Sequence, residues 1–258
     1  MSEPHPSPAA PAGPARPTVV VDDVSVDYTI YAAGKRATSE RKLLRRAPSL
    51  RQARTVHALK GVSFTAHEGE SIGVIGHNGS GKSTLLRAVA GLTTPTRGTV
   101  YADGRPALLG VNAALINELS GERNVILGGL ALGMTPEEIR GRYQEIVDFS
   151  GIGEAVDLPM KTYSAGMGAR LRFAIAASAT HRVLLVDEAL AVGDAAFRRR
   201  SEERIRELRA EAGTVFLVSH SMGTIKETCT RGIWIDHGEL RADGPVLDVV
   251  AAYEASVR

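Results

Sequence analysis

The stretch that decides the fold is Gly76-His77-Asn78-Gly79-Ser80-Gly81-Lys82-Ser83-Thr84, which matches the pattern G-x-x-x-x-G-K-[ST]. It follows the apolar run 72–75 and precedes the helix-like run 85–90, so it stands between an expected strand and an expected helix. In that context the pattern forms a phosphate-binding loop. The glycines let successive backbone N–H groups turn toward an anion at the positive end of the following helix. We therefore predict an α/β protein with a P-loop core.

Two side chains of this loop have distinct expected roles. Lys82 should reach the β- and γ-phosphates of a nucleotide, and the Ser83 hydroxyl should bind Mg²⁺, with Thr84 next to it. The alternative is a glycine-rich turn that binds nothing. The loop alone does not define a function, because kinases, GTPases, motors and transporters all contain one.

Composition sets broad limits on the class of protein. A chain of 258 residues with 43% hydrophobic content can bury a sizeable core, in one large α/β domain or two small ones. The net charge of +2 does not indicate a nucleic-acid partner, and the single cysteine, Cys229, excludes an internal disulfide and a multi-cysteine metal site. No run approaches the ~18 apolar residues that cross a bilayer, and the N-terminus lacks the layout of a secretion signal. If the protein acts at a membrane, we expect it to act from the surface.

Two segments stand apart from the expected domain, 18–258. Residues 1–17 hold six of the chain's 12 prolines, which predicts a disordered tail. Within a basic insertion at 33–56, residues 35–54 contain eight basic residues and one acid, so they carry +7 and the remainder carries 2 − 7 = −5. Leucines add a partial apolar stripe. This insertion is either an amphipathic element facing anionic lipid or substrate, or a solvated loop.

The remaining pattern predicts strands first, then a helical region, then strands again. Residues 18–21 and 24–28 alternate like edge strands, and about 110–180 is mostly helical. The apolar runs 183–186 and 215–218 are typical of parallel strands buried on both faces. Further expected elements are strands at 58–64 and 99–101, an amphipathic helix at 198–209, a hairpin at 232–240 and a closing helix at 246–253.

Two acidic residues close the first of those buried strands. Asp187 and Glu188 should emerge at its carboxyl end, where open α/β sheets bind ligands. Asp187 is placed to hold Mg²⁺, and Glu188 can polarise a water for attack on the γ-phosphate. His220 ends the next buried strand, 33 residues later, and could donate to the γ-phosphate. A surface histidine without a ligand is the alternative reading.

A third segment narrows the function. Tyr163-Ser164-Ala165-Gly166-Met167 precedes the helix-forming run 170–176, so Ser164 and Gly166 should open a helix as a second anion site. In this order the motifs resemble an ATP-binding cassette (ABC) ATPase, in which this signature segment of one subunit closes over the nucleotide held by another. The resemblance covers residues 19–253. It implies a mostly parallel P-loop core with an antiparallel β subdomain and an inserted helical subdomain.

Within that superfamily the sequence is most similar to the ATPase subunits of teichoic-acid, O-antigen and other polysaccharide exporters. Three features support the finer match: the signature written Tyr-Ser-Ala-Gly-Met, the run Asp187-Glu188-Ala189-Leu190-Ala191-Val192-Gly193-Asp194, and the basic insertion. The resemblance implies a homodimer at the cytoplasmic face of the membrane, a separate permease partner, a lipid-linked glycan as cargo, and no nucleic acid.

The resemblance also assigns residues. It implies that Tyr28 stacks on adenine, with Tyr31 as the alternative residue. It also implies that Asp194 lies across the dimer interface. ATP and Mg²⁺ are the implied cofactors, with Lys82, Glu188 and His220 as catalytic residues and Ser83 and Asp187 as metal ligands. The nucleotide would contact Tyr28, Gly76, His77, Asn78, Gly79, Ser80, Gly81, Lys82, Ser83, Thr84, Ser164, Ala165, Gly166, Met167 and Asp194.

The sequence departs from the superfamily at one expected position. A glutamine usually begins the helical subdomain, and here Val111 or Asn112 occupies its place by spacing. We do not take this as inactivation, because polysaccharide-exporter ATPases often deviate there. We also expect no appended carbohydrate-binding domain after the ATPase. The competing hypotheses are a soluble cassette ATPase acting on nucleic acid or ribosomes, and a small-molecule kinase, in which the signature segment and His220 have no role.

Overall fold

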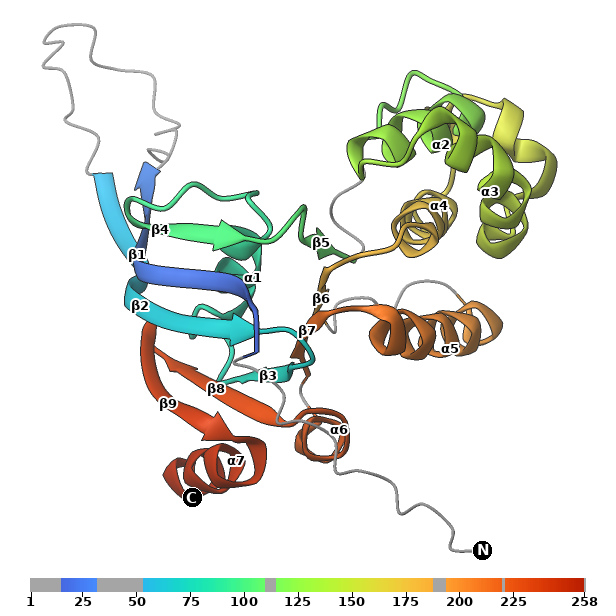
Figure 1. The fold of residues 1–258 in the computed structure, drawn as a ribbon. Coiled ribbons are helices and arrows are strands. Elements are labelled where there is room, and N and C mark those ends of the chain that lie inside the picture. Colours follow the sequence, from blue (N-terminus) through green and yellow to red (C-terminus); the bar gives the residue numbers. More distant parts are fainter. Residues whose placement is uncertain (1–14, 32–52, 110–114, 188–193, 220, 258) are drawn as a thin grey trace, which may run out of the picture.

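The computed structural model describes residues 15–31, 53–109, 115–187, 194–219 and 221–257. These residues form a six-stranded sheet, a three-stranded sheet and three groups of helices (Figure 1). Most of the basic insertion lies outside the described residues. Its last residues, 53–56, belong to a strand that pairs with the segment preceding the insertion.

The six-stranded sheet is mostly parallel, as the resemblance implies. Its order is β5-β6-β7-β3-β8-β9, with parallel pairs from β5 to β8 and an antiparallel β8–β9 hairpin. Helices cover both faces, which explains the unbroken apolar runs of the central strands. The strand bounds are β3 Ser71–Ile75, β5 Ala107–Leu108, β6 Val183–Asp187, β7 Thr214–Val218, β8 Arg231–Asp236 and β9 Glu239–Pro245.

The three-stranded sheet is antiparallel and corrects one prediction. Its order is β2-β1-β4, formed by β1 Pro17–Tyr31, β2 Ala53–His67 and β4 Arg97–Ala102. The segments 18–21 and 24–28 were expected at an edge, but β1 is the central strand and pairs with both neighbours. Alternating burial shows that one face of a strand is covered, whereas it does not show how many strands flank it.

Helix α1, Lys82–Val89, packs between the two sheets. Its Leu85, Leu86 and Val89 share one core with apolar side chains of both sheets, such as Val24 and Phe216. The helix that follows the phosphate loop is therefore held on two sides. This packing fixes where the N-terminus of α1 points.

The region 115–178 forms a separate helical group with its own apolar core, and Figure 1 shows it set apart from the three-stranded sheet. Its three long helices are α2 Gly121–Ala131, α3 Pro136–Ser150 and α4 Ala165–Ser178, with short 3₁₀ turns at Gly153–Asp157 and Met160–Thr162. α3 starts with a capping box between Thr135 and Glu138, and the backbone N–H of Thr135 together with its hydroxyl lowers the pKa of the Glu138 carboxyl. The predicted inserted helical subdomain is confirmed.

Three further helices complete the chain: α5 Ala195–Glu211, α6 Met222–Thr228 and α7 Val246–Ser256. They pack with α4 on the face of the large sheet opposite α1, around Phe197, Ile225 and Val249. Among the described residues, no helix combines the length and the apolar character that a bilayer crossing requires.

Candidate functional site

The phosphate loop has glycine at three positions whose backbone conformation a side chain would strain. Gly76, Gly79 and Gly81 have φ angles of 145°, 80° and 114°, which favour glycine. A Cβ on Gly76 would collide with the carbonyl oxygen of Ile235, and one on Gly81 would collide with that of Ala58. At Gly76 and Gly81 the loop backbone therefore lies against neighbouring strands with no space for a side chain, whereas at Gly79 only the φ angle favours glycine.

The N-terminus of α1 is available to an anion. Gly81 is its N-cap and provides no side-chain cap. The first backbone N–H groups of a helix have no intrahelical partner and carry the positive end of the helix dipole. Packing of α1 between the sheets holds these donors in place.

Lys82 is buried inside the loop. The residue is only 7% exposed. Its ammonium group donates hydrogen bonds to the carbonyl oxygens of Gly76 at 2.7 Å and His77 at 2.8 Å. Burial lowers the pKa of this ammonium below its usual value, while the Asp187 carboxylate partly opposes that effect. A buried cation held only by carbonyl oxygens can transfer to a phosphate that enters the loop.

Ser83 and Asp187 meet at the carboxyl edge of the sheet. The Ser83 hydroxyl donates to the Asp187 carboxylate at 2.9 Å, across 104 residues of sequence. The contact arises because β3 and β6 both run parallel to β7, so the residues that follow them emerge at the same edge. Mg²⁺ prefers hydroxyl, carboxylate, phosphate and water oxygens, and these two groups supply the first two.

The loop also contains an orphaned polar atom. Ser80 is 1% exposed, and its hydroxyl oxygen has no hydrogen-bond partner among the described residues. Leaving a buried hydroxyl without a hydrogen-bond partner costs free energy, so the Ser80 hydroxyl indicates that a bound ligand supplies the missing hydrogen bond. The glycine cradle, the buried ammonium and this hydroxyl together fit a nucleotide phosphate chain with Mg²⁺ at Ser83 and Asp187.

The signature segment caps α4 in the expected way. The Ser164 oxygen accepts from the backbone N–H of Met167 at 3.2 Å, and a Cβ on Gly166 would meet no backbone atom within 4 Å. Ser164 and Ala165 are exposed, so this helix N-terminus faces solvent. No hydrogen bond or ion pair among the described residues joins it to the phosphate loop of the same chain.

Asp194 caps the next helix. Its carboxylate accepts from the backbone N–H of Phe197 at 2.8 Å, and that bond lowers the pKa of the carboxyl group. The same side chain is exposed and lies 3.8 Å from the guanidinium of Arg170 on α4. Asp194 therefore connects the start of α5 to the helix that the signature segment opens.

Tyr28 lies near the C-terminal end of β1. It is opposite Val56 of β2 and 40% exposed. The expected stacking role thus falls on an accessible ring. Four other candidates, Glu188, His220, Val111 and Asn112, lie outside the described residues, and so does the side chain of the alternative Tyr31.

The sequence did not predict that the β8–β9 hairpin contacts the phosphate loop. The backbone N–H of Gly238, in the β8–β9 turn, donates to the Ser80 carbonyl oxygen at 2.8 Å, and His77 Nε2 lies 2.9 Å from Asp236 Oδ1. The hairpin at 232–240 was predicted, whereas its contact with the loop was not. No local pattern marks a contact between segments 159 residues apart.

A phosphate loop between β3 and α1, beside a strand-end aspartate on a mostly parallel sheet, defines a P-loop nucleotide-binding domain. The ABC transporter family model matches residues 59–191. The solved structures that resemble this fold include an ATP-binding subunit of an ABC transporter (TM-score 0.67, 22% identity, covering 92% of this chain and 93% of that one). A second is an ATP-binding cassette solved as a dimer bound to ADP and phosphate (TM-score 0.64, 22% identity, covering 88% and 98%).

Curated relatives agree with the finer resemblance. The O-antigen export system ATP-binding protein RfbB of Myxococcus xanthus is 40% identical over 228 residues, which is 87% of this chain and 52% of that protein. Teichoic acids export ATP-binding proteins TagH are 42% identical in Bacillus cereus, over 78% of this chain and 37% of that protein, and 37% identical in Staphylococcus saprophyticus, over 92% and 88%. The chain thus spans about half or less of some curated relatives and most of others. The chain belongs to the ABC transporter family.

Proposed function

We propose that this protein is the ATP-hydrolysing subunit of an ABC transporter that exports a lipid-linked polysaccharide or teichoic acid through a separate membrane permease. The observation that supports it most directly is the Ser83–Asp187 contact at 2.9 Å, which joins the phosphate loop to the strand-end carboxylate in one site for a magnesium nucleotide. The cargo is proposed from the relatives, which are named for O-antigen and teichoic-acid export.

In this proposal, different residues of the chain have different roles in hydrolysis. The loop amides and Lys82 bind and orient the phosphates, with the ammonium leaving the Gly76 and His77 carbonyls to do so. Ser83 and Asp187 would hold Mg²⁺, which neutralises charge on the phosphates. Glu188 accepts a proton from the attacking water, and His220 donates to the γ-phosphate. These last two roles rest on sequence position.

A second copy completes the site in this proposal. The α4 N-terminus is exposed and unconnected to the phosphate loop of its own chain, so Ser164 to Met167 are free to meet a nucleotide held by a facing subunit. Asp194 would lie at the same dimer interface, next to the helix that the signature segment opens. The dimer of the related cassette bound to ADP and phosphate supports this arrangement.

Co-purification separates this function from the alternative of a soluble cassette acting on nucleic acid or ribosomes. Expressed at native level, the protein should sediment with membranes and, after mild detergent extraction, copurify with a multi-span permease. Nuclease treatment should not release it. Recovery with ribosomes or nucleic acid, lost on nuclease treatment, would favour the alternative.

We expect Tyr28→Ala to weaken ATP binding, because base stacking on an aromatic ring contributes about 1–3 kcal/mol, or roughly 5- to 150-fold in affinity. Tyr28→Phe should retain most of the affinity, since stacking needs the ring and not the hydroxyl. Fluorescent-nucleotide titration measures both. Tyr101→Ala is the control, because Tyr101 is a tyrosine of the same sheet and is 63% exposed. An unchanged affinity in Tyr28→Ala would transfer the role to Tyr31.

A further inference from the structure

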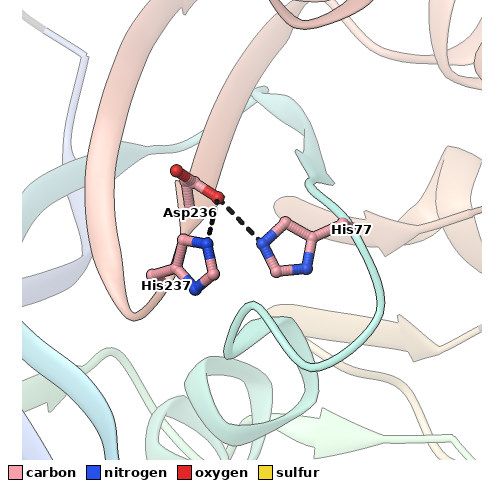
Figure 2. A group of neighbouring side chains, drawn as sticks. All are labelled: His77, Asp236 and His237. Atoms are coloured by element: carbon pink, nitrogen blue, oxygen red, sulfur yellow. Dashed lines mark hydrogen bonds and ion pairs between the residues drawn. The ribbon is translucent and has the colours of Figure 1, made fainter. Parts of the chain in front are cut away.

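One group of metal-ligand side chains within the described residues has no part in the proposed hydrolysis. His77 of the phosphate loop, Asp236 at the end of β8 and His237 in the β8–β9 turn offer ligand atoms that all lie within 4.8 Å of one another. Figure 2 shows both imidazole rings directed at the Asp236 carboxylate. His77 Nε2 lies 2.9 Å from Asp236 Oδ1, and His237 Nε2 lies 3.9 Å from the same oxygen.

The hydrogen bonds of His77 indicate that either a proton or a metal ion lies between its ring and Asp236. Its Nδ1 lies 2.9 Å from the carbonyl oxygen of Asn78, and because a carbonyl oxygen can only accept, Nδ1 carries the proton. In the neutral ring, Nε2 is then a lone pair that faces Asp236 Oδ1 at 2.9 Å. Two acceptors at that distance repel each other unless a proton or a metal ion lies between them.

We propose that His77, Asp236 and His237 form a binding site for a divalent transition metal, for which Zn²⁺ is the probe. Zinc takes imidazole nitrogen and carboxylate oxygen at about 2.0–2.2 Å, so tetrahedral ligands lie about 3.3–3.5 Å apart. The separations of 2.9 Å and 3.9 Å from Asp236 Oδ1 lie on either side of that spacing, and all three ligand atoms lie within 4.8 Å of one another, so metal binding requires the side chains to rotate toward a common centre. Water supplies the remaining coordination position, since the rings are partly exposed.

Neighbouring groups orient two of the three ligands, His77 and Asp236. The Asn78 carbonyl fixes the tautomer of His77 with Nε2 free to bind. Asp236 Oδ2 lies 3.6 Å from Nε of Arg241, which leaves Oδ1 for the metal. A proton between His77 and Asp236 would satisfy those two groups alone, whereas a metal ion also uses His237.

The site would fasten the phosphate loop to the β8–β9 hairpin. These segments already share the Gly238 to Ser80 backbone bond, and Gly238 in turn accepts from Lys60 of β2 at 2.8 Å. A metal bound to His77 adds a side-chain link next to the loop carbonyls that hold Lys82. Occupancy therefore stabilises the folded state by RT ln(1 + c/Kd), where c is the free metal concentration, so above the dissociation constant the stabilisation rises with the logarithm of the metal concentration.

The test is zinc titration of the chelator-stripped, tag-free protein without nucleotide, by calorimetry and by competition with a chromophoric chelator. Wild type should bind Zn²⁺ and show a rise in Tm with zinc. His237→Asn should lose at least about tenfold in affinity and most of that rise. Asparagine suits the turn, because His237 has a φ of 48° and asparagine tolerates that region.

His57→Asn is the matched control. His57 Nδ1 lies 2.7 Å from Asp27 Oδ1 at a similarly exposed site of the three-stranded sheet, and no third ligand accompanies that pair among the described residues. This variant should bind zinc as wild type does. Equal binding by His237→Asn and wild type, a loss in His57→Asn, or no zinc binding at all would overturn the proposal. In the last case a proton links His77 to Asp236.

Discussion

Lys82→Ala lowers steady-state ATP hydrolysis by about 100- to 1,000-fold, the usual effect of removing one preorganised donor to developing phosphate charge. The wild-type ammonium is buried and held by two carbonyl oxygens inside the loop, so it meets the phosphates already desolvated. Alanine leaves the loop without that charge, and no other described lysine lies within it. The measurement is phosphate release by the purified protein at saturating Mg·ATP.

Lys226→Ala is the control for this variant. Lys226 on α6 pairs with Glu254 on α7 at 2.9 Å, and among the described residues it makes no hydrogen bond or ion pair with the phosphate loop. Its loss should leave hydrolysis unchanged. Circular dichroism must show that Lys82→Ala keeps its fold, because the Gly76 and His77 carbonyls also lose their donor. A folded Lys82→Ala protein with wild-type turnover would contradict the phosphate-loop assignment.

Mixing two inactive variants tests whether a second copy of the chain completes each pocket. If each pocket combines one chain's Lys82 with the other chain's Ser164, a dimer of Lys82→Ala with Ser164→Arg keeps one intact pocket. Equimolar mixtures should then hydrolyse ATP faster than either variant alone. Equal activity before and after mixing would indicate that each chain works by itself.

Local motifs predicted the phosphate loop, the strand-end aspartate and the capped signature helix because each is a short pattern with its own geometry. Ser83 and Asp187 could be paired from sequence, since both follow strands expected to be parallel. The central place of β1 could not be predicted, because its pairing with β4 depends on chain segments far away in sequence. Residues 53–56 were assigned to the basic insertion because basic residues lie next to them, whereas in the structure they belong to strand β2.

The group of His77, Asp236 and His237 is a second feature that the sequence could not predict, because it also depends on segments far apart in the chain. His77 was assigned to a nucleotide contact as part of the motif, yet its ring is directed at Asp236 of a distant hairpin. A D-H-G turn predicts only a hairpin. What brings the three side chains together is the adjacency of β3 and β8 in the sheet, which is a tertiary property.

Glu188→Gln separates binding from chemistry, and we expect it to slow hydrolysis by about 100- to 10,000-fold while ATP binding is retained. Glutamine has the shape of glutamate but cannot accept a proton from the attacking water at neutral pH. Because the nucleotide then persists between two subunits, an ATP-dependent dimer should accumulate. Light scattering coupled to gel filtration measures the dimer, and single-turnover assays measure the chemical step.

The dimer is the more informative of these two results. In the proposed dimer, closure needs the phosphate loop of one chain and the exposed α4 N-terminus of the other, so adding Ser164→Arg to Glu188→Gln should abolish the dimer without restoring hydrolysis. Glu227→Gln, at an exposed position of α6, should behave as wild type. If Glu188→Gln stays monomeric at saturating ATP, or turns over at the wild-type rate, the shared pocket is wrong, because a trapped nucleotide would have nothing to hold the two copies together.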